Sequence, residues 1–435
     1  MIRKTIEKSP FFATGVAAFF PIKGKTIDEI KRKIINAILL INDIRKIETK
    51  PKSYPTDIIM NLSNTCNLSC PMCSINNLRE KKVTHVKNTI SLKQVKAFSE
   101  IFQRANHLTF MGLIGESILN PEFTEIIRYL KSYYAISLCI STNGLGLNEK
   151  IQNTMFEIGF DSIIFSIHAA TPETYNILQA GNFDKIIDNI TQFANEKEKR
   201  NLSVSHIKIV YALNKANIKE TNQMIDLAGK LKINELMLYH FRDYGISKLA
   251  LDEDPDSANQ MIDDIYSYAK ECGVISILPK NPPYYKRYIS GEDEDAEIRC
   301  YLPWKGLQMR GSYSHSNSYY LGCCNVFNAF LFNYKKRIDK YGKINFQQIW
   351  HHPVFQYLRE TVNSTSKNER NPLCKYCKSK KRAYLKNTDN AKNYKIKLNV
   401  LQEFFEGFSE KYKKLKEIES LDILYTEDEE LRALA

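Results

Sequence analysis

The sequence of 435 residues has little glycine and proline, with 17 and 14 residues, and no strong bias toward any one kind of residue. A collagen repeat needs glycine at every third position, and glycine- and proline-rich disordered chains need far more of both. With 43% hydrophobic and 26% charged residues, the composition is that of a globular protein. The length fits two or three domains, or one large domain with a smaller module.

The sequence also lacks an apolar run of the roughly 20 residues that a membrane span requires. A stretch near the N-terminus resembles a signal peptide, because Arg3, Lys4 and Lys8 precede the apolar residues 11–20. A Thr-Gly pair interrupts this run, Pro21 follows it, and no small-x-small cleavage site comes after. We therefore expect no membrane span and a cytoplasmic location.

Lysine and arginine exceed the acidic residues by 62 to 49, a net charge of +13 that favours anionic partners such as nucleic acids. Stretches 252–256 and 292–297 are acidic, whereas 375–397 is strongly basic. The basic residues of stretch 375–397 are Lys375, Lys378, Lys380, Lys381, Arg382, Lys386, Lys392, Lys395 and Lys397. Such a stretch after a folded unit is more often a solvated surface than a binding site. Nucleic acid is therefore not the expected partner, and it stays an alternative.

From about residue 57 to 240, short apolar runs alternate with amphipathic stretches of helical length, which predicts repeated βα units around a parallel sheet. The expected strands are 58–62, 108–113, 136–141, 162–167, 207–213 and 235–240. The expected helices are 92–104, 121–132, 149–158, 183–197 and 218–231. Six such units form an open doubly wound sheet or a partial barrel, and in both the ligand site lies at the carboxyl ends of the strands.

The flanking segments have their own patterns. Isoleucines at 27, 30, 34, 35 and 38 have helical spacing and predict a helix packed on the core. Residues 256–271 predict a connecting helix, and 401–421 a last helix on the surface or at an interface. Beyond Cys300 the apolar periodicity gives way to turns, tyrosine, asparagine and cysteine, which is typical of a small module held by metal.

Most of the ten cysteines occur in clusters, which in a large chain without a secretion signal indicates metal binding and not a disulfide framework. Cys139 and Cys272 stand alone, and we expect them to be packed thiols. The clustered cysteines are Cys66, Cys70 and Cys73, then Cys300, Cys323 and Cys324, then Cys374 and Cys377.

The first cluster, directly after the first expected strand, has the spacing Cys66-x3-Cys70-x2-Cys73. Three thiolates on one short loop can hold three irons of a cubane [4Fe–4S] cluster and leave the fourth iron open to a substrate. Structural zinc is the alternative. It needs four closed ligands, however, and no further cysteine or histidine lies nearby before His85.

This triplet at the head of a run of βα units resembles the radical S-adenosylmethionine (SAM) superfamily. After the second strand, residues 115–121 read Gly-Glu-Ser-Ile-Leu-Asn-Pro, similar to the family's Gly-Glu-Pro-Leu-Leu-Asn-Pro segment that binds the SAM amino group. Ser117 replaces the usual proline. Residues 141–144, Ser-Thr-Asn-Gly, are similar to the family's Thr-Asn-Gly turn, and 166–168 read Ser-Ile-His where many relatives have Ser-x-Asp.

The resemblance implies which residues contact the cofactor. Glu116 would pair with the SAM ammonium group, glycine at 115 would let the backbone approach the ligand, and Met72 would pack on the adenine. The implied cofactor-binding residues are Met72, Gly115, Glu116, Thr142, Asn143 and Ser166. Weaker candidates for substrate contact or catalysis are His168, Tyr211, Tyr239 and His240.

The later cysteines, in their order and with Cys374-x-x-Cys377 near the end, resemble the SPASM module that holds auxiliary clusters in many radical SAM enzymes. The set suffices for one further [4Fe–4S] cluster, for which we expect Cys300, Cys324, Cys374 and Cys377 as ligands and Cys323 as a neighbour. A structural zinc site is the alternative for these four thiolates.

The resemblance implies a partial (β/α)6 barrel with a small Cys-rich module and flanking helices. The expected parts are an N-terminal helical extension (1–52), a radical SAM core (53–245), a helical connector (246–299), a SPASM-like module (300–385), and a basic linker with a last helix (386–435).

The implied activity is reductive cleavage of SAM at the first cluster, followed by hydrogen abstraction from a substrate. Expected partners are a small-molecule, sugar or peptide or protein substrate and an electron donor such as flavodoxin or ferredoxin. Two other readings stay open: an iron–sulfur electron carrier or scaffold without SAM chemistry, and a nucleic-acid-modifying or binding protein that uses the basic segment.

Overall fold

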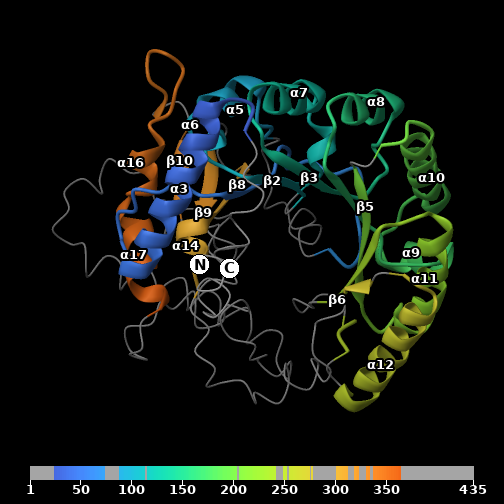
Figure 1. Cartoon of the computed structure of the whole chain (residues 1–435). Coiled ribbons are helices and arrows are strands. Elements are labelled where there is room, and N and C mark those ends of the chain that lie inside the picture. The colour runs from blue at the N-terminus through green and yellow to red at the C-terminus, as the bar shows by residue number, and fades with distance from the viewer. Residues whose placement is uncertain are drawn as a thin grey trace, which may run out of the picture.

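The computed structural model describes residues 24–73, 88–112, 115–202, 205–241, 248–251, 254–274, 276–277, 300–311, 318–322, 330–333 and 337–363. Seven parallel strands follow one another in chain order and form an open arc, with helices on its outer side (Figure 1). They are β1 (Asp57–Met60), β2 (His107–Met111), β3 (Ser137–Thr142), β4 (Ser162–Ser166), β5 (His206–Leu213), β6 (Glu235–His240) and β7 (Ser276–Ile277). The parallel sheet predicted from the βα pattern and the partial barrel that the resemblance implies are confirmed, with a seventh strand that the pattern did not predict.

The helices between the strands pack their apolar faces on the sheet, and several begin at a side-chain cap. Ser91 and Gln94 form a capping box at the start of α5, and Asn148, Thr171 and Asn182 cap three later helices. The helices are α5 (Leu92–Ala97), α6 (Ser99–Phe102), α7 (Phe123–Tyr133), α8 (Glu149–Glu157), α9 (Pro172–Leu178), α10 (Phe183–Lys199), α11 (Thr221–Lys230) and α12 (Pro255–Glu271).

The sheet continues beyond β1 with strands from the C-terminal part of the chain, where we expected only turns. β8 (Gly306–Gly311) pairs with β1 in parallel, and β9 (Ser318–Gly322) and β10 (Phe330–Asn333) add two antiparallel strands. Short helices α14 (Leu302–Lys305), α16 (Phe346–Trp350) and α17 (Pro353–Val362) accompany them. The expectation of turns was wrong because these strands are short and β8 pairs with a strand remote in sequence, so local periodicity is weak.

The predicted N-terminal helix exists as α3 (Ile27–Lys46), but the prediction that its isoleucines pack on the core was wrong. Ile27, Ile34, Ile35 and Ile38 are exposed, whereas the side facing the protein buries mainly polar residues. Those buried residues are Glu29, Lys33, Asn36, Ala37, Leu40 and Asp43.

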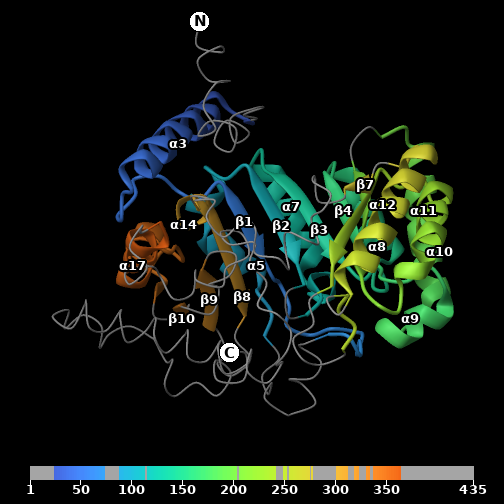
Figure 2. The same ribbon diagram turned by 90° about the horizontal axis from the view of Figure 1, so that it is seen from below.

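Backbone groups near the amino ends of the strands explain the reversed orientation of α3. Lys33 donates to the carbonyl of Ala135 at 2.7 Å, and Asn36 exchanges two hydrogen bonds with the backbone of Tyr54. Asp43 accepts a hydrogen bond from the Ser53 N–H at 2.8 Å. Because these backbone groups need partners when buried, polar side chains of α3 face inward. Figure 2 shows α3 lying at one end of the strands. No helix among the described residues is long and apolar enough to span a membrane.

Candidate active site

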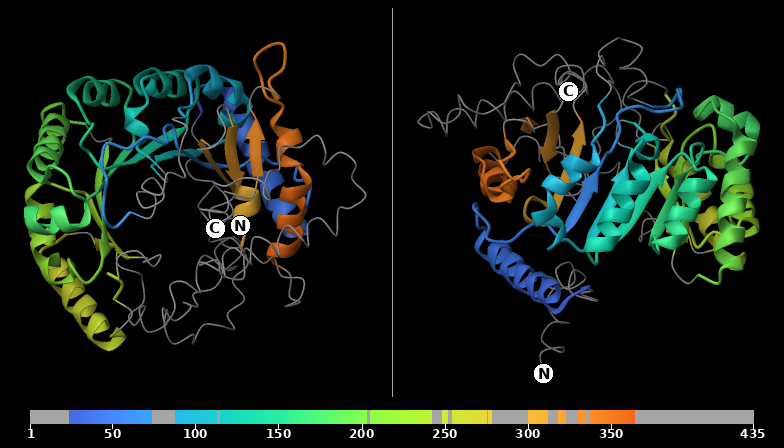
Figure 3. Two further views of the ribbon diagram at one scale, coloured as in Figure 1. Left: turned by 180° about the vertical axis from the view of Figure 1, so that it is seen from behind. Right: turned by 90° about the horizontal axis from the view of Figure 1, so that it is seen from above.

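The loop that carries Cys66, Cys70 and Cys73 leaves the carboxyl end of β1 and is held by the segment that follows β2. Ser117 accepts a hydrogen bond from the Leu62 N–H at 3.2 Å, and the Asn120 amide donates to the Leu62 carbonyl at 2.9 Å. Ser117 stands where the resembled family has proline. Its hydroxyl provides a hydrogen-bond acceptor for the Leu62 N–H, which lies just after β1. Figure 3 shows this end of the sheet and the opposite end, where α3 lies.

Gly115 is required by a close approach of the cysteine loop. A Cβ at this position would lie 2.2 Å from the carbonyl oxygen of Ser63 and 2.7 Å from the Cα of Asn64. No side chain fits against backbone at that distance. In the structure, the segment that approaches the Gly115 backbone is therefore the cysteine loop, which packs directly against it.

Glu116 is buried at the centre of the site, with 3% of its surface exposed. Its carboxylate accepts hydrogen bonds from the N–H groups of Asn143 at 2.9 Å and Ile118 at 3.4 Å. Burial raises the pKa of Glu116 to about 7, although these N–H groups and the Thr142 hydroxyl favour the ionised form. Within the described part of the chain, no lysine, arginine or histidine forms an ion pair with Glu116.

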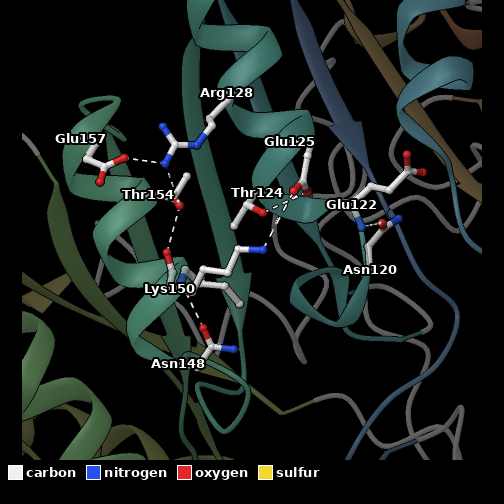
Figure 4. Close-up of polar contacts among 10 residues, drawn as sticks. Asn120, Glu122, Thr124, Glu125, Arg128, Asn148, Lys150, Thr154 and Glu157 are labelled. Atoms are coloured by element: carbon white, nitrogen blue, oxygen red, sulfur yellow. Dashed lines mark hydrogen bonds and ion pairs between the residues drawn. The ribbon is translucent and has the colours of Figure 1, made fainter.

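The acidic residues on the neighbouring helices differ from Glu116. Figure 4 shows Glu125 of α7, whose side chain is half exposed; Thr124 donates to it at 2.9 Å and Lys150 lies 4.0 Å away. Glu157 of α8 pairs with Arg128. These two carboxylates have a cation nearby, whereas Glu116 has none among the described residues.

Asn143 connects Glu116 to the first cysteine. Its side-chain amide donates to Asn67 at 2.8 Å and lies 3.8 Å from the Cys66 sulfur, while its backbone N–H binds the Glu116 carboxylate. The turn is shaped by Gly144, whose φ of +78° is a left-handed conformation that favours glycine. Gly115, Glu116, Thr142 and Asn143 therefore lie together beside the cysteine loop.

Ser166 and His168 form a fixed pair at the end of β4. The Ala212 N–H donates to His168 Nδ1 at 3.0 Å, so Nδ1 carries no proton. Burial lowers the pKa of His168 to about 4, which keeps the ring neutral with its proton on Nε2. Nε2 then donates to the Ser166 hydroxyl at 3.0 Å, and that hydroxyl can donate its own proton to a bound ligand.

Helix α9 joins Ser166 to the cysteine loop. The Met72 N–H donates to the carbonyl of Leu178 at 3.3 Å. Gln179, directly after the helix, accepts from the His168 N–H at 2.8 Å and donates to the Ser166 carbonyl at 2.9 Å. Gln179 was not among the predicted site residues, because its role depends on backbone partners that the sequence does not reveal.

Tyr175 of α9 is a second residue that sequence reasoning did not assign. Its side chain is fully buried, and within the described residues its hydroxyl has no hydrogen-bond partner. Burial, then the nearby thiols of Cys70 and Cys66, raise the pKa of Tyr175.

The chemistry of the donor set, three thiols on one short loop, fits an iron–sulfur cluster. Within the described residues, no three His, Cys, Asp or Glu side chains are gathered closely enough to hold one metal ion. The partnerless Tyr175 hydroxyl beside Cys66 and Cys70 is consistent with a polar group that belongs in this space.

The other candidate residues have different surroundings. Tyr211 is fully buried, and its hydroxyl donates to the Asn217 carbonyl at 3.0 Å, whereas Tyr239 of β6 is 46% exposed. The side chain of His240, at the end of β6, lies outside the described residues. Of the two isolated cysteines, Cys139 is partly buried, but Cys272 is exposed and is not the packed thiol we expected.

Of the second cysteine set, only Cys300 lies in the described part of the chain. It is buried, its N–H donates to the Asn363 side chain at 2.9 Å, and that side chain donates back to the Cys300 carbonyl at 2.9 Å. This exchange ties Cys300 to the end of α17. Cys324, Cys374 and Cys377 lie outside the described residues.

An open parallel arc with three cysteines and a buried carboxylate at its carboxyl edge defines an α/β protein of the partial-barrel class with a candidate ligand site at that edge. Residues 60–227 match the family model described as the radical SAM superfamily.

Curated relatives match about half of the chain. A probable GTP 3′,8-cyclase of Saccharolobus islandicus is 27% identical over 201 residues, 46% of this chain and 61% of the relative. That of Saccharolobus solfataricus is 25% identical over 236 residues, 54% of this chain and 70% of the relative. The chain thus spans about 61% of the length of the first of these relatives.

Solved structures match a larger share of the chain and show its fold. Streptococcus suis SuiB bound to S-adenosylmethionine has a TM-score of 0.55 at 14% identity, covering 81% of this chain and 78% of SuiB. SuiB bound to the precursor peptide SuiA has a TM-score of 0.54 at 13% identity, covering 86% of this chain and 83% of SuiB.

Proposed function

We propose that this chain is a radical SAM enzyme that binds SAM at a [4Fe–4S] cluster held by Cys66, Cys70 and Cys73. The observation that carries the proposal is the Glu116 carboxylate, which is buried beside the cysteine loop and has no cation among the described residues. A buried carboxylate without a cation is costly, and an ammonium group of a ligand supplies the missing charge. SAM carries such a group.

The superfamily implies the chemistry that the cluster supplies. When bound, the cluster would supply one-electron reductive cleavage of the bond between sulfur and the 5′ carbon of SAM, giving methionine and a 5′-deoxyadenosyl radical. That radical would take a hydrogen atom from a C–H bond of the substrate, giving 5′-deoxyadenosine and a substrate radical. An electron donor such as flavodoxin or ferredoxin would supply the electron.

The chain's own residues would bind and orient SAM. Glu116 would pair with the ammonium, and Asn143 fixes Glu116 through its backbone N–H. The Ser166 hydroxyl, which His168 leaves free to donate, would bind an oxygen of the ribose or carboxylate. Met72, which a hydrogen bond to Leu178 fixes, would pack on the adenine.

The substrate in this proposal is a small molecule, a sugar or a peptide or protein side chain. SuiB, which shares the fold over most of this chain, was solved with a precursor peptide, whereas the curated relatives are probable GTP 3′,8-cyclases. We further propose a SPASM-type auxiliary cluster on Cys300, Cys324, Cys374 and Cys377, with oxidation or other C–H functionalisation as the reaction. Buried Cys300, fixed by Asn363, is the described member of this set.

Formation of 5′-deoxyadenosine tests the proposal. Anaerobically reconstituted protein with a strong reductant and SAM should form it, Cys70→Ala should not, and Cys272→Ala, an exposed cysteine far along the chain, should retain it. Equal product from wild type and Cys70→Ala would contradict the proposal. Without product from a cluster-bearing wild type, a SAM titration decides, because failure to bind SAM would leave an electron carrier or scaffold.

A further inference from the structure

The buried tyrosines of the protein differ in how their hydroxyls are satisfied. Tyr211 donates to the Asn217 carbonyl at 3.0 Å, Tyr54 donates to Glu100, and the Tyr129 and Tyr134 hydroxyls lie 2.9 Å apart. Tyr175 is as deeply buried as Tyr211, yet within the described residues its hydroxyl has no partner. Burying a hydroxyl without a hydrogen bond costs about 1–3 kcal/mol, so a partner is expected from outside the described protein atoms.

The surroundings of the hydroxyl point to the space inside the cysteine loop. A Cβ on Gly181 would lie 3.3 Å from the Tyr175 hydroxyl and 2.7 Å from the side chain of Leu68. Leu68 stands midway between Cys66 and Cys70 in the loop. Glycine at 181 therefore leaves room for the loop beside the hydroxyl. The cysteines Cys70 and Cys66 contribute to the raised pKa of this hydroxyl.

Helix α9 holds Tyr175 in a fixed position relative to the loop. Its N-terminus is capped by Thr171, its carbonyl at Leu178 accepts from the Met72 N–H, and Gln179 binds the end of β4. The Tyr175 ring packs on Phe183 with centroids 5.5 Å apart. The hydroxyl therefore cannot turn toward solvent without breaking these contacts.

We propose that the Tyr175 hydroxyl donates a hydrogen bond to a sulfur of the cluster held by Cys66, Cys70 and Cys73. The inference rests on the proposed function, since it needs the cluster. The acceptor is a thiolate of Cys66 or Cys70 or a sulfide between the irons. Such a bond stabilises the reduced cluster more than the oxidised one, because the reduced form carries more negative charge, so Tyr175 raises the reduction potential.

The test is a redox titration of the reconstituted cluster in the absence of SAM, monitored by electron paramagnetic resonance. Tyr175→Phe keeps the ring that packs on Phe183 and removes only the donor, and its potential should shift to a more negative value. Tyr211→Phe removes a hydroxyl that already has a protein partner, and its potential should match the wild type. An unchanged potential in Tyr175→Phe, or an equal shift in both variants, would overturn the inference.

A second variant covers the case in which Tyr175→Phe does not retain its cluster. Replacing Tyr175 by 3-fluorotyrosine keeps the ring and makes the hydroxyl a stronger donor, so the potential should shift to a more positive value. No shift would overturn the inference. Iron analysis separates this result from the proposed function: a wild type without a cluster at the triplet contradicts the function, whereas a normal cluster insensitive to Tyr175 contradicts only the role of Tyr175.

Discussion

Two buried glutamates lie at opposite ends of the strands and have different partners. Glu29 of α3, at the amino ends, accepts from the Ala135 N–H at 2.8 Å and lies 3.4 Å from the Lys33 ammonium. Glu116, at the carboxyl ends, accepts from the N–H groups of Asn143 and Ile118 but has no ion pair among the described residues. Both are almost fully buried, so exposure to solvent does not account for the difference.

The comparison separates a structural contact from a ligand site. At the amino ends, the polar side chains of α3 meet backbone groups and one another, and together they hold the helix in place. At the carboxyl ends, within the described part of the protein, the Glu116 carboxylate has no cation and the Tyr175 hydroxyl has no hydrogen-bond partner. Because buried polar groups are usually paired in stable proteins, these two groups support the proposal that a cofactor binds beside the cysteine loop.

The largest effect is expected where the cysteine loop packs on the sheet. Gly115→Ala would bring a methyl group to 2.2 Å from the Ser63 carbonyl, so the loop must move, at a cost of about 1–3 kcal/mol in unfolding free energy. Reconstituted Gly115→Ala should lose most of its iron at the triplet. The control is Gly229→Ala in α11, where a Cβ meets nothing within 4 Å and should stabilise the protein by about 1 kcal/mol. Full iron content in Gly115→Ala would contradict the packing.

The next effect concerns the charge of Glu116. Glu116→Gln keeps the shape of the side chain and removes the carboxylate, so the Kd for SAM should rise about ten- to a hundredfold, corresponding to about 1.5–3 kcal/mol. Glu125→Gln, at an exposed position of α7, should leave the Kd unchanged (Figure 4). Calorimetric titration measures both variants, and equal affinities would refute the role of Glu116.

The pKa of Glu116 predicts how binding and stability depend on pH. Because this pKa is about 7 in the ligand-free protein, SAM should bind more tightly as the pH rises through 7 and the carboxyl group ionises. The folded protein holds an extra proton between the ordinary pKa of 4.5 and 7, so its own stability should fall as the pH rises through this window. Thermal unfolding between pH 5 and 8 checks this, and Glu116→Gln should flatten the dependence.

The smallest effects are expected on the free energy of unfolding when residues on the two sides of α3 are replaced. Lys33→Ala removes the donor to the Ala135 carbonyl and the cation beside Glu29, and it should lower the free energy of unfolding by about 1–3 kcal/mol. Ile34→Ala, on the exposed side, should change it by no more than about 0.5 kcal/mol. Denaturant unfolding measures both, and a larger loss for Ile34→Ala would mean that its side is covered.

The sequence predicted the parts of the fold and site that depend on local pattern. Six strands and the cofactor motifs could be recognised because apolar runs and motif residues adjoin in the chain. The orientation of α3 could not be predicted from the sequence, since it depends on backbone groups of Ser53, Tyr54 and Ala135 that need hydrogen-bond partners. Pairing of β8 with β1 and the partnerless Tyr175 hydroxyl likewise depend on contacts between distant segments.

The most direct test of the central claim is whether Glu116 recognises the SAM amino group. The measurement is calorimetric binding of SAM and of an analogue without the α-amino group, each to reconstituted wild type and Glu116→Gln. The account predicts that loss of the amino group weakens binding to the wild type but has little further effect in the variant, because each change removes the same ion pair. Equal weakening in both proteins, or equal affinity of the wild type for both ligands, would contradict it.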